Sequence, residues 1–240
     1  MNPKSLGILY LIPVPLSDDA VEKSFTPHSL ELIQNIDEYI VENPKTARKF
    51  LKVAGLQRPL QEVLMHDYGK HHRDKAPISS FFKGLESGKD VGLMSEAGCP
   101  AIADPGSEIV AEAHKRGIKV VPLVGPNSVL LALMASGFSG QNFAFHGYLP
   151  IDKNQRASKI KELEKESARN FQTQIFIETP FRNHALLEDL IKNLKPQTKL
   201  CVAVNLSGDS EKIISKSIGE WKNVKIDFHK IPAIFLLSNS

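Results

Sequence analysis

Two loops rich in glycine and proline carry the residue types in this chain that best suit ligand binding. One contains Gly98-Cys99-Pro100, and the other contains Val124-Gly125-Pro126. Glycine allows a ligand to approach the main chain closely, and proline stiffens the turn that presents it. The chemistry that these loops favour is therefore binding and positioning by main-chain groups.

The residues around the loops predict a strand, a loop and a helix, and then the same order again. Apolar runs at Val91–Met94 and 119–123 predict the strands. Pro105 can open the first helix at a position that needs no N–H group, and Gly117 can close it as a left-handed cap. Parallel strands joined by a helix place both loops at one carboxyl edge of a sheet, where open α/β folds bind ligands. We therefore expect the loops to form one site on adjacent strands.

Several familiar site motifs are absent from the sequence. It contains no G-x-G-x-x-G, no G-x-x-x-x-G-K-[ST] and no G-x-S-x-G. Their absence disfavours a dinucleotide-binding fold of the usual kind, a P-loop enzyme and an α/β-hydrolase. His66, His71 and His72 have no cysteine or carboxylate at a recognisable ligand spacing, so we expect no metal site.

The composition of the chain bounds its class. Its 240 residues, 42% of them hydrophobic, are enough to bury one large core or two modest ones. Cys99 and Cys201 lie far apart and predict neither a disulfide framework nor a zinc site. The N-terminal segment predicts a first strand rather than a signal peptide, and no apolar run approaches the roughly 20 residues that cross a bilayer. We therefore expect a cytoplasmic protein without a membrane segment.

Charge gives a weak indication of the partner. The formal net charge of +3 slightly favours an anionic one. The stretch from Lys153 to Lys165 is interpreted as a solvated helix face, because it also contains acids. Two other basic clusters leave an RNA-binding surface open: Lys45, Arg48, Lys49 and Lys52 in one segment, and His66, Lys70, His71, His72, Arg73 and Lys75 in another.

Short apolar runs alternate with amphipathic segments along the chain, which is typical of an α/β protein. The segment 137–150 carries three glycines and a proline, and it predicts a boundary between domains of residues 1–140 and 141–240. The segment from Trp221 to Phe228 is expected in a core or a dimer surface rather than in a base-stacking platform. Strands are expected at 9–12, 39–41, 63–65, 143–148, 173–177, 200–205, 212–217 and 233–237, and helices at 26–36, 46–53, 78–85, 154–167 and 183–194.

Four patterns follow a known family in order and spacing. Residues 94–106 correspond to V-S-D-A-G-T-P-L-I-S-D-P-G, and residues 121–128 to V-x-P-L-P-G-A-x-A. Residues 145–150 correspond to F-x-G-F-L-P, and residues 177–182 to Y-E-S-x-x-R. The chain thereby resembles the tetrapyrrole (corrin/porphyrin) methylase superfamily, the class III S-adenosylmethionine-dependent methyltransferases. Within it, the chain is most similar to bacterial enzymes that methylate a ribose 2′-hydroxyl of small-subunit ribosomal RNA.

The resemblance implies a fold, a cofactor and a site. It implies two α/β domains with S-adenosylmethionine in the cleft between them, and a homodimer. A sulfonium methyl group is already activated, so positioning and charge matter more than a nucleophile or a metal, and no catalytic residue is singled out. The residues that the resemblance places at the methyl donor are Pro13, Leu16, Gly98, Cys99, Pro100, Ile102, Asn127, Ser128, Glu178, Thr179 and Leu206.

The acceptor side of the resemblance differs from the ribosomal RNA branch. Residues 14–19 correspond to T-P-I-G-N-L of that branch but have a different sequence. The branch has E-D-T-R where this chain has Glu42-Asn43-Pro44-Lys45, and it has H-E-H-N where this chain has His66-Asp67-Tyr68-Gly69. We favour structured RNA of the small ribosomal subunit as the acceptor. The alternatives are a tetrapyrrole or other small-molecule acceptor, and a catalytically inactive donor-binding protein that acts as an interaction module.

Overall fold

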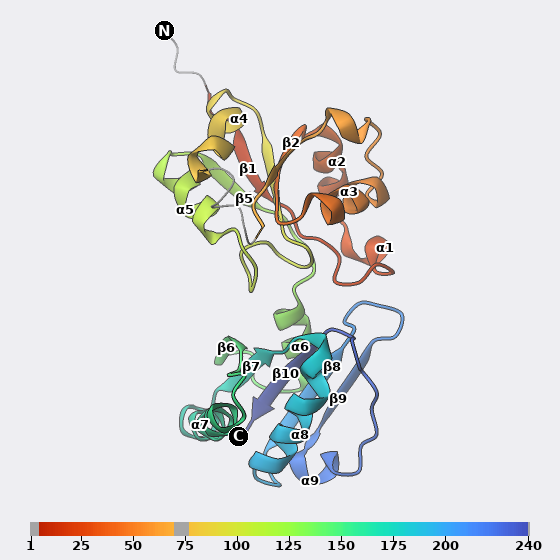
Figure 1. The fold of residues 1–240 in the computed structure, drawn as a ribbon, viewed down its shortest axis with the longest axis vertical. Coiled ribbons are helices and arrows are strands. Elements are labelled where there is room, and N and C mark those ends of the chain that lie inside the picture. Colours follow the sequence, from red (N-terminus) through yellow and green to blue (C-terminus); the bar gives the residue numbers. More distant parts are fainter. Residues whose placement is uncertain (1–4, 70–76, 240) are drawn as a thin grey trace. The chain divides into compact units, whose positions relative to one another are not determined.

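The structure, a computed structural model, describes residues 5–69 and 77–239. The chain folds into two compact units, Met1–Asn127 and Ser128–Ser240. Each unit has a five-stranded sheet with helices packed on it (Figure 1). The predicted fold class of two α/β domains is therefore confirmed.

The sheet of the first unit is parallel throughout, because each of its strands pairs in parallel with its neighbours. The strand order is β3-β2-β4-β1-β5. The expectation that β4 and β5 are adjacent is wrong, since the first strand of the chain lies between them. Their carboxyl ends still share one edge. The strands are β1 Ile8–Leu11, β2 Glu38–Val41, β3 Leu64–Asp67, β4 Val91–Met94 and β5 Lys119–Pro122.

Helices cover both faces of this sheet (Figure 1). On one face, Ile33 and Leu51 of α2 and α3 pack with Tyr39 in a buried cluster. On the other, Leu85 and Ile109 of α4 and α5 pack in a second cluster. The helices are α1 Val21–Ser24, α2 Pro27–Asn35, α3 Pro44–Val53, α4 Lys83–Glu86 and α5 Ser107–Lys115, with 3₁₀ turns η1 Leu60–Glu62 and η3 Ile78–Phe82.

Local capping explains where these helices begin. Thr26 accepts a hydrogen bond from the Ser29 N–H group at the start of α2, as its cap position predicts. The expectation that Pro105 opens α5 is wrong. Gly106 has a φ of +132° outside the helical region, so it caps the helix and α5 starts at Ser107. The expected helix over 78–85 is a 3₁₀ turn that continues into a short α-helix.

The sheet of the second unit is mixed, with strand order β6-β7-β10-β8-β9. β6 and β7 are parallel, whereas β10 runs antiparallel to both β7 and β8. The carboxyl ends of β6, β7 and β8 therefore share an edge with the start of β10. The strands are β6 Phe143–Tyr148, β7 Thr173–Ile177, β8 Lys199–Val204, β9 Lys212–Ser217 and β10 Ala233–Ser238.

One core cluster fills the space between this sheet and three of its helices. Trp221 and Phe228 are fully buried in the cluster, so of the two predicted places for this segment, a core or a dimer surface, these two residues occupy the core. α6 packs against β8, β9 and β10, which places it in the second unit although the sequence predicts a boundary near residue 140. The helices are α6 Ser128–Ser136, α7 Lys153–Asn170, α8 Asn183–Asn193 and α9 Ile218–Trp221, with the 3₁₀ turn η4 Pro180–Arg182.

An ion pair joins α7 to α8 inside the second unit. The Nε and Nη2 atoms of Arg156 donate to Oδ2 of Asp189 at 2.8 and 2.6 Å. The side chains of the pair are only 10% and 8% exposed. Arg156 Nη1 also donates to the carbonyl oxygen of Ile151 at 2.9 Å, so the buried guanidinium is well satisfied. No helix within the described ranges is long and apolar enough to span a membrane.

Candidate functional site

The parallel sheet of the first unit has a topological switch point between β1 and β4. From β1 the chain continues through α1 and α2 to β2 on one side, and from β4 it continues through α5 to β5 on the other. Open α/β sheets bind ligands outside the carboxyl ends of their strands at such a point. The topology therefore directs attention to the loops after β1, β4 and β5, which include both loops singled out in the sequence.

These three loops are joined to one another. Val14 and Gly98 form an isolated antiparallel bridge, in which each N–H group donates to the other residue's carbonyl oxygen at 2.8 Å. The thiol of Cys99 donates to the carbonyl oxygen of Pro126 at 3.3 Å. The side chain of Asn127 also hydrogen-bonds to Cys99. The loops after β1, β4 and β5 thus form one connected structure, which we call the three-loop edge (residues 13–16, 98–102 and 124–127).

The three-loop edge is packed so closely that two of its positions have little room for a side chain. A Cβ atom added at Gly125 would lie 2.3 Å from Cβ of Pro13. A Cβ atom added at Gly98 would lie 3.3 Å from Cδ2 of Leu16, and the Gly98 φ of +71° already disfavours other residues. Positions 98 and 125 therefore require glycine, because Leu16 and Pro13 lie too close to their main chain for another side chain to fit.

The loop that follows β4 has an unusual backbone. Ala101 and Ala103 adopt positive φ values of 66° and 64°. Alanine in this region costs roughly 1–2 kcal/mol, and such strain clusters at functional sites. The Ile102 side chain between them is exposed. No local pattern predicts this strain, because alanine usually indicates ordinary helical or extended backbone.

The surroundings of the Cys99 thiol make it a poor nucleophile. Burial raises the pKa of the thiol, and the hydrogen bond with Asn127 only partly offsets that rise. A neutral thiol is a weak nucleophile near neutral pH. Cys99 therefore acts as a connector between two loops rather than as a reacting group.

Three carboxyl groups lie beside the three-loop edge. Glu42 follows β2, Glu96 follows β4, and Asp104 lies just before α5. Oε2 of Glu42 accepts a hydrogen bond from the Glu96 N–H group at 3.1 Å. Burial, together with the charges of Glu42 and Glu96, raises the pKa of Asp104 to about 6, although a hydrogen bond with Ser95 opposes the rise. This acidic group makes the edge of the sheet locally negative.

We expect Asp104→Asn to change how stability depends on pH. Folded Asp104, with its raised pKa of about 6, holds its proton more tightly than the unfolded chain, where the ordinary value is 3.8. Its contribution to stability is therefore fully present below the unfolded pKa and is lost as the pH rises through the folded one. Asparagine carries no charge, so at pH above 7 the variant should unfold with a free energy larger by about 1 kcal/mol.

Thermal unfolding followed by circular dichroism, at pH values on both sides of the Asp104 pKa, measures this effect. The advantage of Asp104→Asn should shrink steadily as the solution becomes more acidic. A difference from the wild type that is the same at every pH would show that Asp104 does not titrate in this range.

The second unit has its own set of predicted site residues at one edge of its sheet. Glu178 and Thr179 follow β7, and Leu206 follows β8. The Glu178 carboxylate is buried and accepts hydrogen bonds from the Thr179 N–H group at 2.6 Å and from Arg182 Nη2 at 2.6 Å. Asn205 has a φ of +49°, and its N–H group donates to the Pro232 carbonyl oxygen at 3.0 Å. These residues share the edge where β7 and β8 end and β10 begins.

The structure thus groups the predicted donor residues into two sets. The set in the first unit lies on the three-loop edge. The set in the second unit lies at the carboxyl ends of its strands, except for Ser128, which begins α6. The first set is Pro13, Leu16, Gly98, Cys99, Pro100, Ile102 and Asn127, and the second is Ser128, Glu178, Thr179 and Leu206. Sequence reasoning missed Asp104 and Arg182 as members of these edges, although both lie within the quoted motifs.

The basic clusters are only partly described. Lys45, Arg48, Lys49 and Lys52 are all exposed on α3, and Lys49 pairs with Asp18. α3 begins directly after the carboxyl end of β2. In the other cluster, His66 Nε2 lies 2.8 Å from Oε1 of Glu38. Lys70, His71, His72, Arg73 and Lys75 lie outside the described residues.

Comparison with solved structures agrees with the observed fold. A cobalt precorrin-4 methyltransferase, a cobalamin biosynthetic enzyme, aligns with a TM-score of 0.61 over 96% of this chain and 94% of its own. The sequence identity of that alignment is 15%, so it bears on the fold alone.

Comparison with known sequences identifies the family. Ribosomal RNA small subunit methyltransferase I of Bacillus subtilis is 34% identical over 92% of this chain and 73% of its own. The protein of the same name from Vibrio cholerae is 30% identical over 91% of this chain and 71% of its own. The family model of the Tetrapyrrole (Corrin/Porphyrin) Methylases matches residues 9–222. Enzymes of this kind take the methyl group from S-adenosylmethionine. The chain therefore belongs to the Tetrapyrrole (Corrin/Porphyrin) Methylases and is an S-adenosylmethionine-dependent methyltransferase.

Proposed function

We propose that this enzyme methylates a ribose 2′-hydroxyl of small-subunit ribosomal RNA. The observation that carries the proposal is the identity of 30–34% with ribosomal RNA small subunit methyltransferase I over about nine-tenths of the chain. The matched region includes the three-loop edge and the edge that carries Glu178. The proposal therefore covers both sets of candidate site residues.

The residues of the three-loop edge fit S-adenosylmethionine. The cofactor carries a positively charged sulfonium and an ammonium group, and the carboxyl groups of Glu42, Glu96 and Asp104 provide negative charge beside the loops. Gly98 and Gly125 have no side chain, so the loops approach one another closely there. A polar, cationic ligand is bound by main-chain hydrogen-bonding groups and by acidic side chains, and this edge provides both.

We assign the donor contacts to the two sets of residues already placed. In the first unit they are Pro13, Leu16, Gly98, Cys99, Pro100, Ile102 and Asn127, and in the second unit Ser128, Glu178, Thr179 and Leu206. S-adenosylmethionine supplies an activated methyl group when it is bound. The role of this chain is then to bind and orient the reactants, which requires a rigid loop such as the one held by the Val14–Gly98 bridge.

The basic face of α3 supports an RNA acceptor. Lys45, Arg48 and Lys52 are exposed, and the helix starts at the same sheet edge as the three loops. Lysine and arginine side chains that project from one helix face contact phosphate groups without regard to base sequence. An extended polyanion could bind there while one of its riboses reaches the edge.

The replaced acceptor-side residues favour a second candidate, a tetrapyrrole or another small acceptor. Asn43 of this region caps α3 through its side chain and donates from Nδ2 to Oε1 of Glu96 at 3.0 Å. An asparagine here lacks the negative charge of the aspartate that the ribosomal RNA branch has at this position. A strain that lacks the protein separates the two candidates.

Mass mapping of ribosomal RNA from that strain is the experiment that tests the proposal. One 2′-O-methyl group in the small-subunit RNA should be missing, and a plasmid copy of the wild type should restore it. A complete and unchanged methylation pattern in the deletion strain would instead point to the small-molecule acceptor.

We place the enzyme in the cytoplasm, as a homodimer. Ribosomal RNA as the acceptor supports the location. The exposed apolar side chains of Leu130 and Met134 on α6 support a surface that self-association would cover. Light scattering of the purified protein tests the assembly, and a mass of one chain at every concentration would contradict it.

A further inference from the structure

Phe181 is a large aromatic residue at the surface of the second unit. Its side chain is 69% exposed, although it lies in η4 only two residues beyond Thr179. The Arg182 N–H group donates to the Thr179 carbonyl oxygen at 2.9 Å, which fixes the turn that carries Phe181. The buried Glu178 carboxylate holds the Arg182 side chain. A rigid turn therefore presents an exposed ring beside the residues that we assign to the donor site.

Two residues from a distant part of the chain, His229 and Lys230, lie against this ring. Nζ of Lys230 lies 5.6 Å from the centroid of the Phe181 ring, and the ring of His229 meets it edge-on at 6.3 Å. The Lys230 N–H group donates to the carbonyl oxygen of Pro180 at 3.3 Å, so the segment before β10 is tied to η4. Lys230 adopts a φ of +62°, a strained value that this contact helps to maintain.

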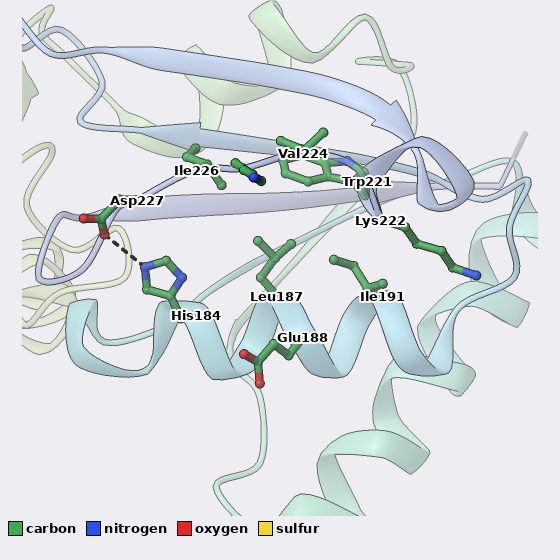
Figure 2. A pocket seen from close by; sticks show the side chains of 10 residues that line it. His184, Leu187, Glu188, Ile191, Trp221, Lys222, Val224, Ile226 and Asp227 are labelled. Atoms are coloured by element: carbon green, nitrogen blue, oxygen red, sulfur yellow. Dashed lines mark hydrogen bonds and ion pairs between the residues drawn. The ribbon is translucent and has the colours of Figure 1, made fainter.

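The aromatic surface continues along α8. The ring of His184 lies 6.5 Å from that of His229 and 4.5 Å from that of the buried Phe228. His184 Nε2 lies 3.3 Å from Oδ1 of Asp227 (Figure 2). Beyond this pair, a cavity of about 660 Å³ opens between α8 and residues 221–227, with Lys222 and Lys225 among its lining residues. The surface is therefore aromatic at one end and carries lysines along its length.

Exposed aromatic rings next to lysines are what proteins use to hold single-stranded nucleic acid. Bases stack on the rings, and the cationic groups contact the phosphates. Sequence-specific recognition of RNA targets single-stranded loops, whose unstacked bases stack on aromatic side chains. We propose that Phe181, His229 and Lys230 form a platform that stacks a base of the single-stranded RNA next to the methylated nucleotide. This inference rests on the proposed function and names the residues that would hold its acceptor.

Replacement of the ring tests the platform. A fluorescein-labelled single-stranded oligoribonucleotide, titrated with the full-length protein and followed by anisotropy, gives the dissociation constant. Phe181→Ala should weaken binding about 10-fold, because stacking of one base is lost. Phe181→Trp keeps a stacking surface and should bind as tightly as the wild type. The same affinity for Phe181→Ala and the wild type would overturn the proposal, as would a wild type that does not bind this RNA.

Phe171 provides a matched control in the same unit. It is 71% exposed, and it precedes β7 at the end opposite to Phe181. Phe171→Ala should leave RNA affinity unchanged, and an equal loss in both variants would show that exposed aromatic residues bind without a specific platform. Unfolding followed by the fluorescence of Trp221 should be alike in both variants, since neither ring is buried.

Salt dependence tests the role of Lys230. Removal of one lysine that contacts a phosphate lowers the slope of log affinity against log salt by about 0.7 for a single strand. Lys230→Ala should show this change, whereas Lys165→Ala on the exposed face of α7 should not. If Lys230→Ala leaves the slope of log affinity against log salt unchanged, Lys230 does not contact a phosphate of the RNA.

Two outcomes separate this inference from the proposed function. Methyl transfer by the wild type to small-subunit ribosomal RNA tests the function alone. If that transfer occurs and Phe181→Ala leaves both the RNA affinity and the KM for RNA unchanged, the function stands and the platform is wrong. If Phe181→Ala instead weakens the binding of a carboxylated porphyrin and not of RNA, the ring serves a tetrapyrrole and the proposal is overturned.

Discussion

Gly98→Val is expected to lower the affinity for S-adenosylhomocysteine more than 100-fold. Gly98 has a φ of +71°, a conformation that a β-branched residue avoids. The new Cβ would lie 3.3 Å from Cδ2 of Leu16, so the loop must move. Movement breaks the paired hydrogen bonds between Val14 and Gly98, which hold the loops after β1 and β4 together. Isothermal titration calorimetry measures the loss, which corresponds to roughly 2.8 kcal/mol or more.

Gly117→Val is the matched control for this prediction. Gly117 has nearly the same φ, +69°, but a Cβ added there meets no atom within 4 Å. It ends α5 and belongs to none of the three loops. Both variants therefore carry similar backbone strain, and only Gly98→Val should lose ligand affinity. Equal affinities in the two variants would show that the three-loop edge does not bind the donor.

Asp189→Ala is expected to lower the unfolding free energy of the second unit by about 3–5 kcal/mol. The substitution leaves the buried guanidinium of Arg156 without its ionic partner, while the hydrogen bond to the Ile151 carbonyl oxygen remains. An uncompensated buried charge is far more costly than the loss of an exposed pair. Trp221 is the only tryptophan of the chain and is buried in this unit, so its fluorescence during urea unfolding reports the effect.

Two further variants identify the source of that loss. Glu162→Ala removes the exposed pair between Lys159 and Glu162 on α7 and should change stability by less than about 0.5 kcal/mol. The double variant Arg156→Met with Asp189→Leu removes both charges and should regain most of the stability that Asp189→Ala loses. If the double variant is no more stable than Asp189→Ala, burial of an unpaired charge is not the cause.

Strands with clear local signals were predictable from the sequence. The strands at 91–94, 143–148, 173–177 and 212–217 have the predicted bounds, because each is an apolar or alternating run between polar or glycine-bearing turns. The place of β1 between β4 and β5 was not predictable in this way. Strand order depends on contacts between distant segments, which no local pattern encodes.

The position of the candidate site was predictable from the sequence, but the contacts between its distant residues were not. The loops after β4 and β5 could be assigned to one sheet edge, because parallel strands share their direction. The raised pKa of Asp104 depends on the charges of Glu42 and Glu96, which only the folded sheet brings together. The contact of Lys230 with Phe181 likewise joins two loops that lie far apart in the sequence. The individual donor contacts stay predictions, and Gly98→Val tests them.

Transfer of a labelled methyl group to ribosomal RNA is the most direct test of the proposed function. The purified protein is incubated with labelled S-adenosylmethionine and with small ribosomal subunits from a strain that lacks the protein. The RNA is then digested to nucleosides for mass spectrometry. We expect the label in a single 2′-O-methyl nucleoside, and we expect Gly98→Val, unlike Gly117→Val, to transfer none. Label recovered in a base, or no label in RNA while a tetrapyrrole is methylated, would contradict the proposed function.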